Sequence, residues 1–169
     1  MIPVFDGHND ILYRILMAPE AREAIWLTGQ GKGHLDLPRM QAGGFAGGLF
    51  AIYVPSPAEE GDAALDSLMD APPYRLPLPE PLPLAASQAV AFGLAAQLLW
   101  MERSSGGAFR LCRTAAEIET ARQDGVIAGV MHMEGAEAID EGCDALHAFH
   151  AMGLRSLGPV WSRPTAFGH

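Results

Sequence analysis

The sequence is poor in cysteine and in basic residues, and both shortages narrow the classes of protein to which it can belong. Two cysteines, Cys112 and Cys143, occur in 169 residues. They are too few for a disulfide framework and lack the spacing of a zinc finger, so a cytoplasmic location is expected, with one bridge as the alternative. Lysine and arginine number 11 against 20 acidic residues, for a net charge of -9. Nucleic acid and anionic membrane surfaces are therefore poor partners for this chain.

Long hydrophobic runs are also missing. The N-terminus, MIPVFDGHND, has no basic segment followed by a long apolar one, so it does not resemble a signal peptide. The most apolar stretch, LAASQAVAFGLAAQLLW, is interrupted by serine and glutamine and favours a soluble protein over a membrane span. What is present is a globular composition, with 49% hydrophobic and 18% charged residues. We expect one domain, or part of a larger one.

Short apolar runs alternate with helical patterns along the chain. Strands are expected at 2–5, 48–54, 109–112, 126–133 and 154–161, and helices at 11–17, 85–103, 114–123 and 144–152. Continuous apolar strands separated by helices are typical of a parallel α/β sheet. No Gly-x-Gly-x-x-Gly follows a strand, so a dinucleotide site is not indicated.

One segment interrupts this alternation. Residues 70–84, DAPPYRLPLPEPLPL, hold six of the 13 prolines. Proline cannot continue a helix or sit in a central strand, so we expect an extended surface insertion. A spacer is the simpler role for it, and a lid or an oligomer contact is the alternative.

Polar residues follow the first apolar run, in FDGHND. His8 and Asp10 are two residues apart, which in an extended segment places both side chains on one face. Ligands gather at the carboxyl ends of strands in parallel α/β folds, and an imidazole with a carboxylate suits zinc or a similar ion. A capping or turn role is the alternative. His34 and Asp36 repeat the spacing in a glycine-rich loop without a preceding strand, so we interpret them as structural, with Asp36 capping a short helix.

A further carboxylate, Glu134, follows the apolar strand VIAGVMHM. A carboxylate that leaves a buried strand has to be paired, solvated or bound to metal. The alternative is that Glu134, or Glu137, caps the next helix. His132 is expected in the core or beside the site rather than as a ligand, and His147 and His150 are expected on an outer helical face.

Four stretches in combination resemble the membrane (renal-type) dipeptidase family of zinc peptidases, which have the TIM (β/α)8 barrel of metal-dependent hydrolases. They are DGHND at 6–10, DLPRMQAGGFAGGLFAIY at 36–53, HMEGAEAID at 132–140 and GLRSLGPVWS at 153–162. The family's proteins are about twice as long as this chain. The resemblance therefore implies that residues 1–169 are the N-terminal half of one (β/α)8-barrel peptidase domain, with an insertion at about 70–84.

The resemblance also implies a metal site. His8 and Asp10 match the family's first pair of metal ligands, and Glu134 matches the catalytic glutamate that bridges two zinc ions. The remaining histidine ligands are expected beyond residue 169. The implied reaction is hydrolysis of the peptide bond of a dipeptide by a hydroxide that bridges the two ions.

Three other residues enter through the same resemblance. Asp6 is expected to orient His8. Trp161 occupies the position of a family histidine that polarises the substrate carbonyl, and His169, in the same segment, is a candidate replacement. The expected partner is a small dipeptide, and a homodimer is one expected assembly. The alternatives are another amidohydrolase acting on a small amide or acylated amino acid, and a metal-binding scaffold without activity.

Overall fold

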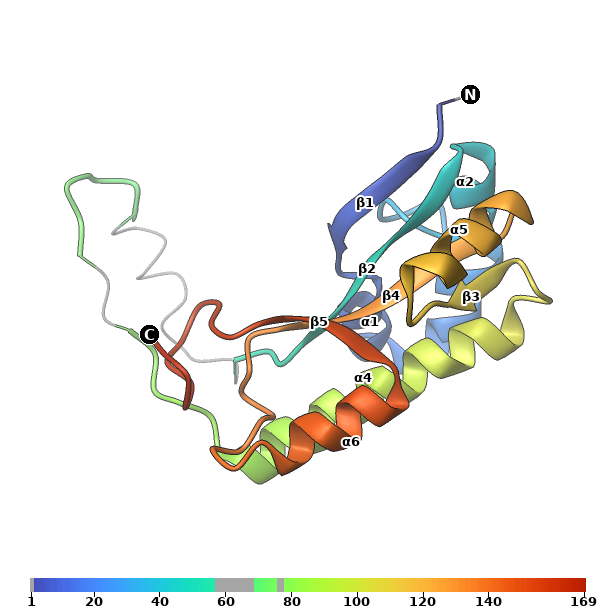
Figure 1. Cartoon of the computed structure of the whole chain (residues 1–169). Helices are drawn as coiled ribbons and strands as arrows, with labels where there is room; N and C mark the ends of the chain where they lie inside the picture. The colour runs from blue at the N-terminus through green and yellow to red at the C-terminus, as the bar shows by residue number, and fades with distance from the viewer. Residues whose placement is uncertain (1, 57–68, 76–77) are drawn as a thin grey trace.

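A single parallel sheet organises the computed structural model, which describes residues 2–56, 69–75 and 78–169 (Figure 1). Every pairing between its strands is parallel. The predicted parallel α/β class is therefore confirmed. The strands are β1 (Val4–Asn9), β2 (Phe45–Tyr53), β3 (Phe109–Leu111), β4 (Ile127–Glu134) and β5 (Leu154–Gly158).

Helices occupy the connections between these strands. They are α1 (Ile11–Leu16), η1 (Pro19–Ala21), η2 (Ala24–Thr28), α2 (Leu37–Ala42), α4 (Leu84–Ser104), α5 (Ala115–Gln123) and α6 (Asp144–Met152). The four longer predicted helices are found within one or two residues of their expected bounds. Helices η1 and η2 were not expected. The π-helical turn η2 is held by tertiary contact, because Trp26 is fully buried and its indole Nε1 donates to the Met101 carbonyl at 3.0 Å.

Strand β4 is the centre of the sheet. Strand β2 pairs along one edge of β4 in continuous register, from Gly47 opposite Ala128 to Tyr53 opposite Glu134. The other edge is shared, because β3 pairs with residues 127–129 of β4 and β5 pairs with residues 131–134. Strand β1 adds to the outer side of β2, which gives the order β1-β2-β4-β3 with β5 also on β4.

Three predicted strand boundaries are wrong by three or more residues. Strand β2 begins at Phe45 rather than at residue 48. Strand β1 runs from Val4 to Asn9 rather than ending at residue 5, because it continues to pair with β2, where Asp6 lies opposite Gly48. A Cβ at Gly48 would lie only 3.0 Å from the Asp6 Cβ, so glycine permits the close approach. Strand β5 stops at Gly158 instead of residue 161, because Pro159 has no amide hydrogen for the ladder.

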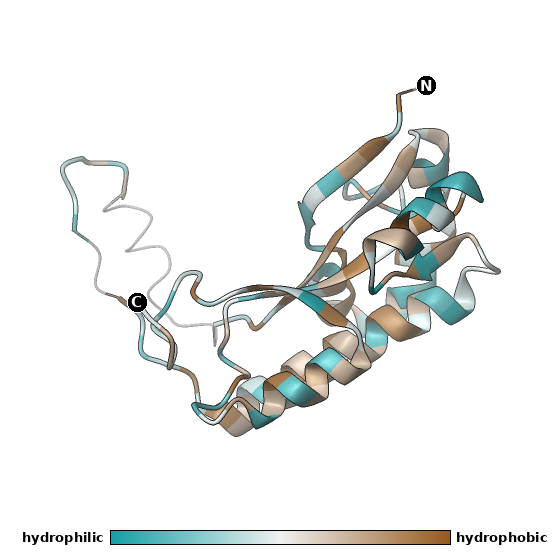
Figure 2. Ribbon diagram, in the orientation of Figure 1, coloured by the Kyte–Doolittle hydropathy of each residue, from teal (hydrophilic) through white to brown (hydrophobic). Residues whose placement is uncertain are grey.

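Helix α4 supplies much of the core, and Figure 2 shows teal, hydrophilic residues among the pale and brown ones along it. Leu94, Leu98 and Met101 are buried, and the helix packs on β2, β3 and α1. Its length and composition suffice for a membrane span, with a mean hydropathy of 1.4 over 18 residues, of which 33% are buried. The packed face accounts for its inner apolar residues, whereas Phe92 on the outer face is 60% exposed.

The described part of the proline-rich segment lies on the surface. Residues 71–75 and 78–81 are exposed and belong to no helix or strand, while residues 76 and 77 lie outside the described part. Its role as a spacer, a lid or an oligomer contact stays a prediction. Cys112 is buried and Cys143 half-buried, and both are free thiols, so the single-bridge alternative is wrong.

Candidate metal centre

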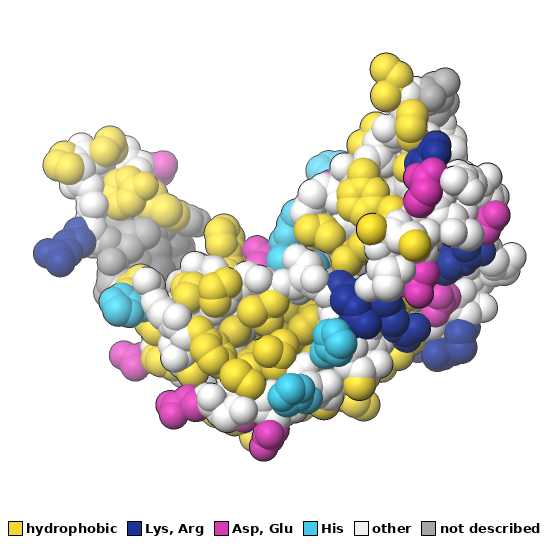
Figure 3. Space-filling model, in the orientation of Figure 1, with side chains coloured by type: hydrophobic (Ala, Val, Ile, Leu, Met, Phe, Trp, Pro, Cys, Tyr) yellow, Lys and Arg dark blue, Asp and Glu magenta, His cyan; other side chains and the backbone are white. Residues whose placement is uncertain are grey.

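The carboxyl ends of β1 and β4, with β2 between them, bring polar side chains together. His8 lies near the end of β1, Asp10 follows that strand, and Glu134 is the last residue of β4. Glu134 pairs with Tyr53 of β2 on one side and with Gly158 of β5 on the other. Figure 3 shows histidine and acidic side chains together on the wall of the hollow that opens at the top of the view.

The His8 imidazole stands between the two carboxylates. Its Nε2 lies 3.3 Å from Asp10 Oδ1 and 3.2 Å from Glu134 Oε2. One ligand atom from each of the three residues lies within 4.8 Å of the other two. Because the atoms are an imidazole nitrogen and two carboxylate oxygens, the set fits zinc or a similar divalent ion. The structure thus brings together the three predicted ligands, although His8 and Glu134 are far apart in the sequence.

Electrostatics at Glu134 also favour a cation. Burial raises the pKa of the Glu134 carboxyl, and the nearby Asp10 carboxylate raises it further, whereas His8 acts in the opposite direction. Two carboxylates held close together repel each other unless a positive charge lies between them. A cation bound at these three side chains would relieve that repulsion.

His132 lies beside the centre without entering the ligand group. Its ring packs edge-on against His8 with 5.6 Å between the ring centroids, and its Nδ1 lies 2.8 Å from Ser156 Oγ on β5. Burial lowers the pKa of His132, and the neighbouring His8 lowers it further. The imidazole is therefore kept neutral, and its position agrees with the expectation of a residue beside the site.

Asp6 does not make the contact that was expected of it. Its Oδ1 accepts from the backbone amide of His8 at 3.4 Å, and its Oδ2 accepts from Asn9 Nδ2 at 3.1 Å. The same Asn9 nitrogen donates to the Leu49 carbonyl of β2 at 3.1 Å. Asp6 is therefore linked to β2 through Asn9, and among the described residues no hydrogen bond joins its carboxylate to the imidazole that it was predicted to orient.

Trp161 and His169 lie in the segment that follows β5. Both are exposed, Trp161 by 59%. Within the described ranges, no hydrogen bond or ion pair joins either residue to His8, Asp10 or Glu134. A substrate-binding role for them stays a prediction. His147 and His150 are exposed on α6, as expected.

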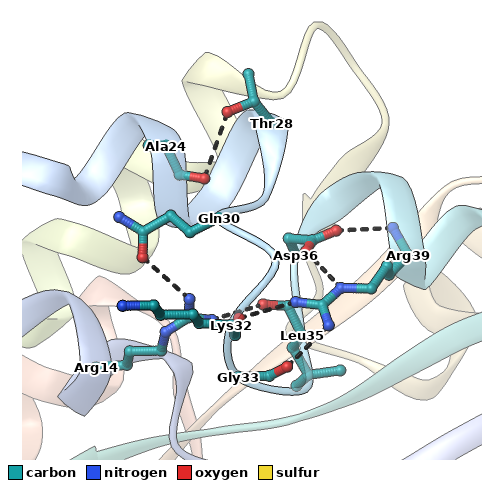
Figure 4. Close-up of polar contacts among 9 residues, drawn as sticks. All are labelled: Arg14, Ala24, Thr28, Gln30, Lys32, Gly33, Leu35, Asp36 and Arg39. Atoms are coloured by element: carbon teal, nitrogen blue, oxygen red, sulfur yellow. Dashed lines mark hydrogen bonds and ion pairs between the residues drawn. The ribbon is translucent and has the colours of Figure 1, made fainter.

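In the second His-x-Asp pair, the Asp36 carboxylate has a structural role, as predicted (Figure 4). Asp36 is the N-cap of α2, and its Oδ1 accepts from the Arg39 amide at 2.8 Å. Its Oδ2 lies 2.5 Å from Arg39 Nε, and the Arg39 guanidinium also donates to the carbonyls of Lys32 and Gly33. These bonds, with a further one from Arg14 to the Leu35 carbonyl, hold the glycine-rich loop in one conformation.

This loop lines a cavity of about 870 Å³ that opens beside β1. His8, Asp10 and Asp6 lie on its wall, together with residues of α1 and His34 of the loop. Two of the candidate ligands, His8 and Asp10, are thus accessible from a space large enough for a small molecule.

A buried ion pair close to the centre was not predicted. Arg163 Nη1 lies 3.2 Å from Glu137 Oε1, and both side chains are at most 2% exposed. Glu137 was considered only as a helix cap, which it is not, since Asp140 accepts from the first amides of α6. The pairing partners are 26 residues apart. No local pattern in the sequence indicates such a contact.

Comparison with known proteins identifies the relatives of this chain. The profile of the membrane dipeptidase family (Peptidase family M19) matches residues 1–169. An uncharacterized protein in the PQQ-III 3′ region of Acinetobacter calcoaceticus is 36% identical over 170 residues, which cover 99% of this chain and 51% of that protein. The chain thus spans about half the length of this relative.

Solved structures give the same result. A metallo peptidase from Rhodobacter sphaeroides, liganded with a phosphinate mimic of the dipeptide L-Ala-D-Ala, is 62% identical, with a TM-score of 0.92 over 99% of this chain and 48% of that one. A second structure, of the metallo peptidase dipeptidase AC, is 62% identical with a TM-score of 0.91, over 99% of this chain and 47% of that one. The expected (β/α)8-barrel hydrolase fold is confirmed, with this chain corresponding to roughly half of it. The chain belongs to the membrane dipeptidase family, Peptidase family M19.

Proposed function

We propose that the full-length protein is a zinc-dependent dipeptidase, with His8, Asp10 and Glu134 among its metal ligands. The observation that carries this proposal is the convergence of the three ligand atoms within 4.8 Å at the carboxyl ends of β1 and β4. The 62% identity to metallo peptidases over 99% of the chain supports the same activity. Further ligands from the remainder of the protein would complete a two-ion centre.

Each residue has a distinct part in this proposal. Glu134, the least exposed of the three, would be the ligand that two ions share, while His8 and Asp10 would hold one of them. Bound zinc supplies a Lewis acid for the scissile carbonyl and lowers the pKa of a coordinated water. His8 Nε2 lies close to both carboxylates, so the three side chains would hold an ion between them.

A dipeptide with a C-terminal D-residue is the first substrate to test. The related Rhodobacter sphaeroides structure was solved with a mimic of L-Ala-D-Ala, and its identity of 62% favours a similar substrate here. A dipeptide extends over about 7 Å. This length is compatible with the cavity of about 870 Å³ on whose wall two of the ligands, His8 and Asp10, lie.

The test combines zinc content with turnover in the full-length protein. We expect bound zinc, hydrolysis of L-Ala-D-Ala, and loss of both zinc and activity in His8→Ala and Glu134→Ala. His147→Ala, which removes an exposed imidazole from α6, is the matched control and should keep both. A protein that binds zinc but cleaves only acylated amino acids would point to a different amidohydrolase. Zinc binding without any hydrolysis would indicate an inactive scaffold.

A further inference from the structure

Arg163 is a charged side chain in an unusual place, because only 1% of it is exposed. It lies in the segment after β5, and its guanidinium reaches two other segments. Nη1 donates to the Val54 carbonyl at 2.8 Å and to Glu137 Oε1 at 3.2 Å, and Nη2 donates to Ser56 Oγ at 2.7 Å. One guanidinium therefore joins the segments that follow β2, β4 and β5.

These three segments leave the sheet next to the candidate metal centre. Tyr53, Glu134 and Gly158 are paired across β2, β4 and β5, so the strands end in one row. A backbone hydrogen bond from the Ala136 amide to the Pro159 carbonyl, at 3.3 Å, adds a direct link between the segments after β4 and β5. Arg163 thus connects the segments that follow β2 and β5, the two strands that flank Glu134 in the sheet.

Glu137, the acidic partner of Arg163, lies in the segment that follows Glu134. Gly135 has a φ of +79°, and a Cβ there would lie 2.4 Å from Glu137 Oε2. Glycine is therefore required both by the backbone conformation and by the carboxylate that lies against it. Among the described residues, Arg163 is the one side chain that pairs with Glu137. Removing the guanidinium alone would leave a buried, unpaired carboxylate.

The segment that Arg163 anchors is a closed loop of residues 159–168. The Thr165 amide donates to the Gly168 carbonyl at 2.9 Å, and Thr165 Oγ1 donates to the Pro159 carbonyl at 2.9 Å. The loop exposes two aromatic side chains, Trp161 by 59% and Phe167 by 40%. It is therefore internally bonded and fixed at Arg163, yet it presents apolar surface.

Chain length limits how far Trp161 can lie from Glu134 and from a substrate that extends from Glu134 toward β5. Trp161 is three residues after Gly158, which pairs with Glu134. Three residues span at most about 11 Å, and paired strands lie about 5 Å apart. A dipeptide extends over about 7 Å, so an indole at this position is within reach of its side chains.

We propose that Arg163 is a positioning residue that holds the 159–168 loop as a fixed aromatic wall of the substrate site. This inference rests on the proposed dipeptidase function. A loop that is already ordered when the substrate arrives does not lose conformational entropy on binding, so the anchor lowers KM for dipeptides with apolar side chains. Arg163 itself does not touch the substrate.

The test uses the full-length, zinc-loaded protein and the double variant Glu137→Gln with Arg163→Met. Replacing both partners avoids a buried, unpaired charge that would prevent folding. We expect zinc content to stay at the wild-type value. The kcat/KM for L-Ala-D-Ala should fall roughly 10- to 100-fold, the effect of a misplaced binding group, mainly because KM rises. The Thr165 and Gly168 amides should exchange hydrogen faster than in the wild type.

Two further variants keep the inference falsifiable. Arg163→Lys retains a charge opposite Glu137 but not the forked geometry, so its KM should lie between those of the wild type and the double variant. Arg155→Met removes an exposed arginine on β5 that also binds backbone carbonyls, and it should leave KM unchanged. Wild-type KM and amide exchange in the double variant would overturn the inference, and so would a parallel loss of zinc.

The outcome separates this inference from the proposed function. If the wild-type protein cleaves no dipeptide, the proposed function fails. The exchange rates of the Thr165 and Gly168 amides still show whether Arg163 keeps the loop ordered. Faster exchange in an inactive protein would then support the anchor and overturn its role in substrate binding.

Discussion

Removing the Asp36 carboxylate should lower stability without changing metal binding, whereas removing the Asp10 carboxylate should abolish metal binding with little effect on stability. Asp36 is 2% exposed, caps α2 and binds both the amide and the guanidinium of Arg39. Loss of a cap costs about 1 kcal/mol, and loss of a hydrogen bond to a charged group costs about 1.5 kcal/mol or more. Asp36→Ala should therefore lower the free energy of unfolding by about 2 to 3 kcal/mol without changing zinc content.

Asp10 offers the matched comparison. Its side chain is 57% exposed, and its one polar side-chain contact among the described residues is with His8 at 3.3 Å. Exposed pairs of this kind contribute about 0 to 1 kcal/mol. Asp10→Ala should therefore leave the metal-free protein nearly as stable as the wild type while zinc binding is lost.

The assay is equilibrium urea unfolding of the metal-free full-length protein at pH 7, with zinc content measured after dialysis against zinc and then buffer. The reasoning would be refuted by equal zinc loss in the two variants. It would equally be refuted if Asp36→Ala unfolded at the same urea concentration as the wild type, because the cap and ion pair would then contribute nothing.

Three further comparisons test the fold. Hydrogen bonds from the first amides of α6 hold the pKa of Asp140 below its usual value, so urea unfolding should show that Asp140→Asn is less stable than the wild type at pH 7, with the gap closing as the pH falls below about 4. Leu98→Ala, at a fully buried site on α4, should cost about 2 to 5 kcal/mol in the same assay, whereas Phe92→Ala, at a 60% exposed site, should cost less than about 0.5 kcal/mol. Gly93→Ala adds a Cβ in open space and should stabilise α4 by roughly 0.5 to 1 kcal/mol, whereas Gly129→Ala meets the Phe109 ring and should cost about 1 to 3 kcal/mol. Equal effects within either of the last two pairs would contradict the packing described for α4 and β4.

Local patterns in the sequence predicted the elements whose ends are set by neighbouring residues. Asp36 was identified as an N-cap, and its side chain accepts from the amide three residues on. The bounds of α6 were predicted correctly. The apolar run of β4 indicated both a buried strand and a carboxylate at its end. In each case the controlling contacts lie within a few residues, so single-sequence reasoning suffices.

Contacts between distant residues explain what was missed. Strand β1 continues past Gly7 to Asn9 because its pairing with β2 resumes there, opposite Phe50, whereas the sequence alone predicted that the strand ends at residue 5. The buried Glu137–Arg163 pair joins two loops, and neither residue has a local pattern that predicts its burial. The sharing of one edge of β4 by β3 and β5 also depends on tertiary packing.

The position of Glu134 at the end of the central strand has a consequence for how the protein acquires metal. About 125 residues separate His8 from Glu134, and β2 lies between their strands in the sheet. A newly made chain that has only folded its first two strands offers His8 and Asp10, two ligands that bind zinc weakly. Tight binding therefore begins only when β4 has docked on β2, after a long loop has closed. In the proposed centre, metal capture would accordingly follow assembly of the sheet, and a bound ion would hold the first strand of the chain to the fourth.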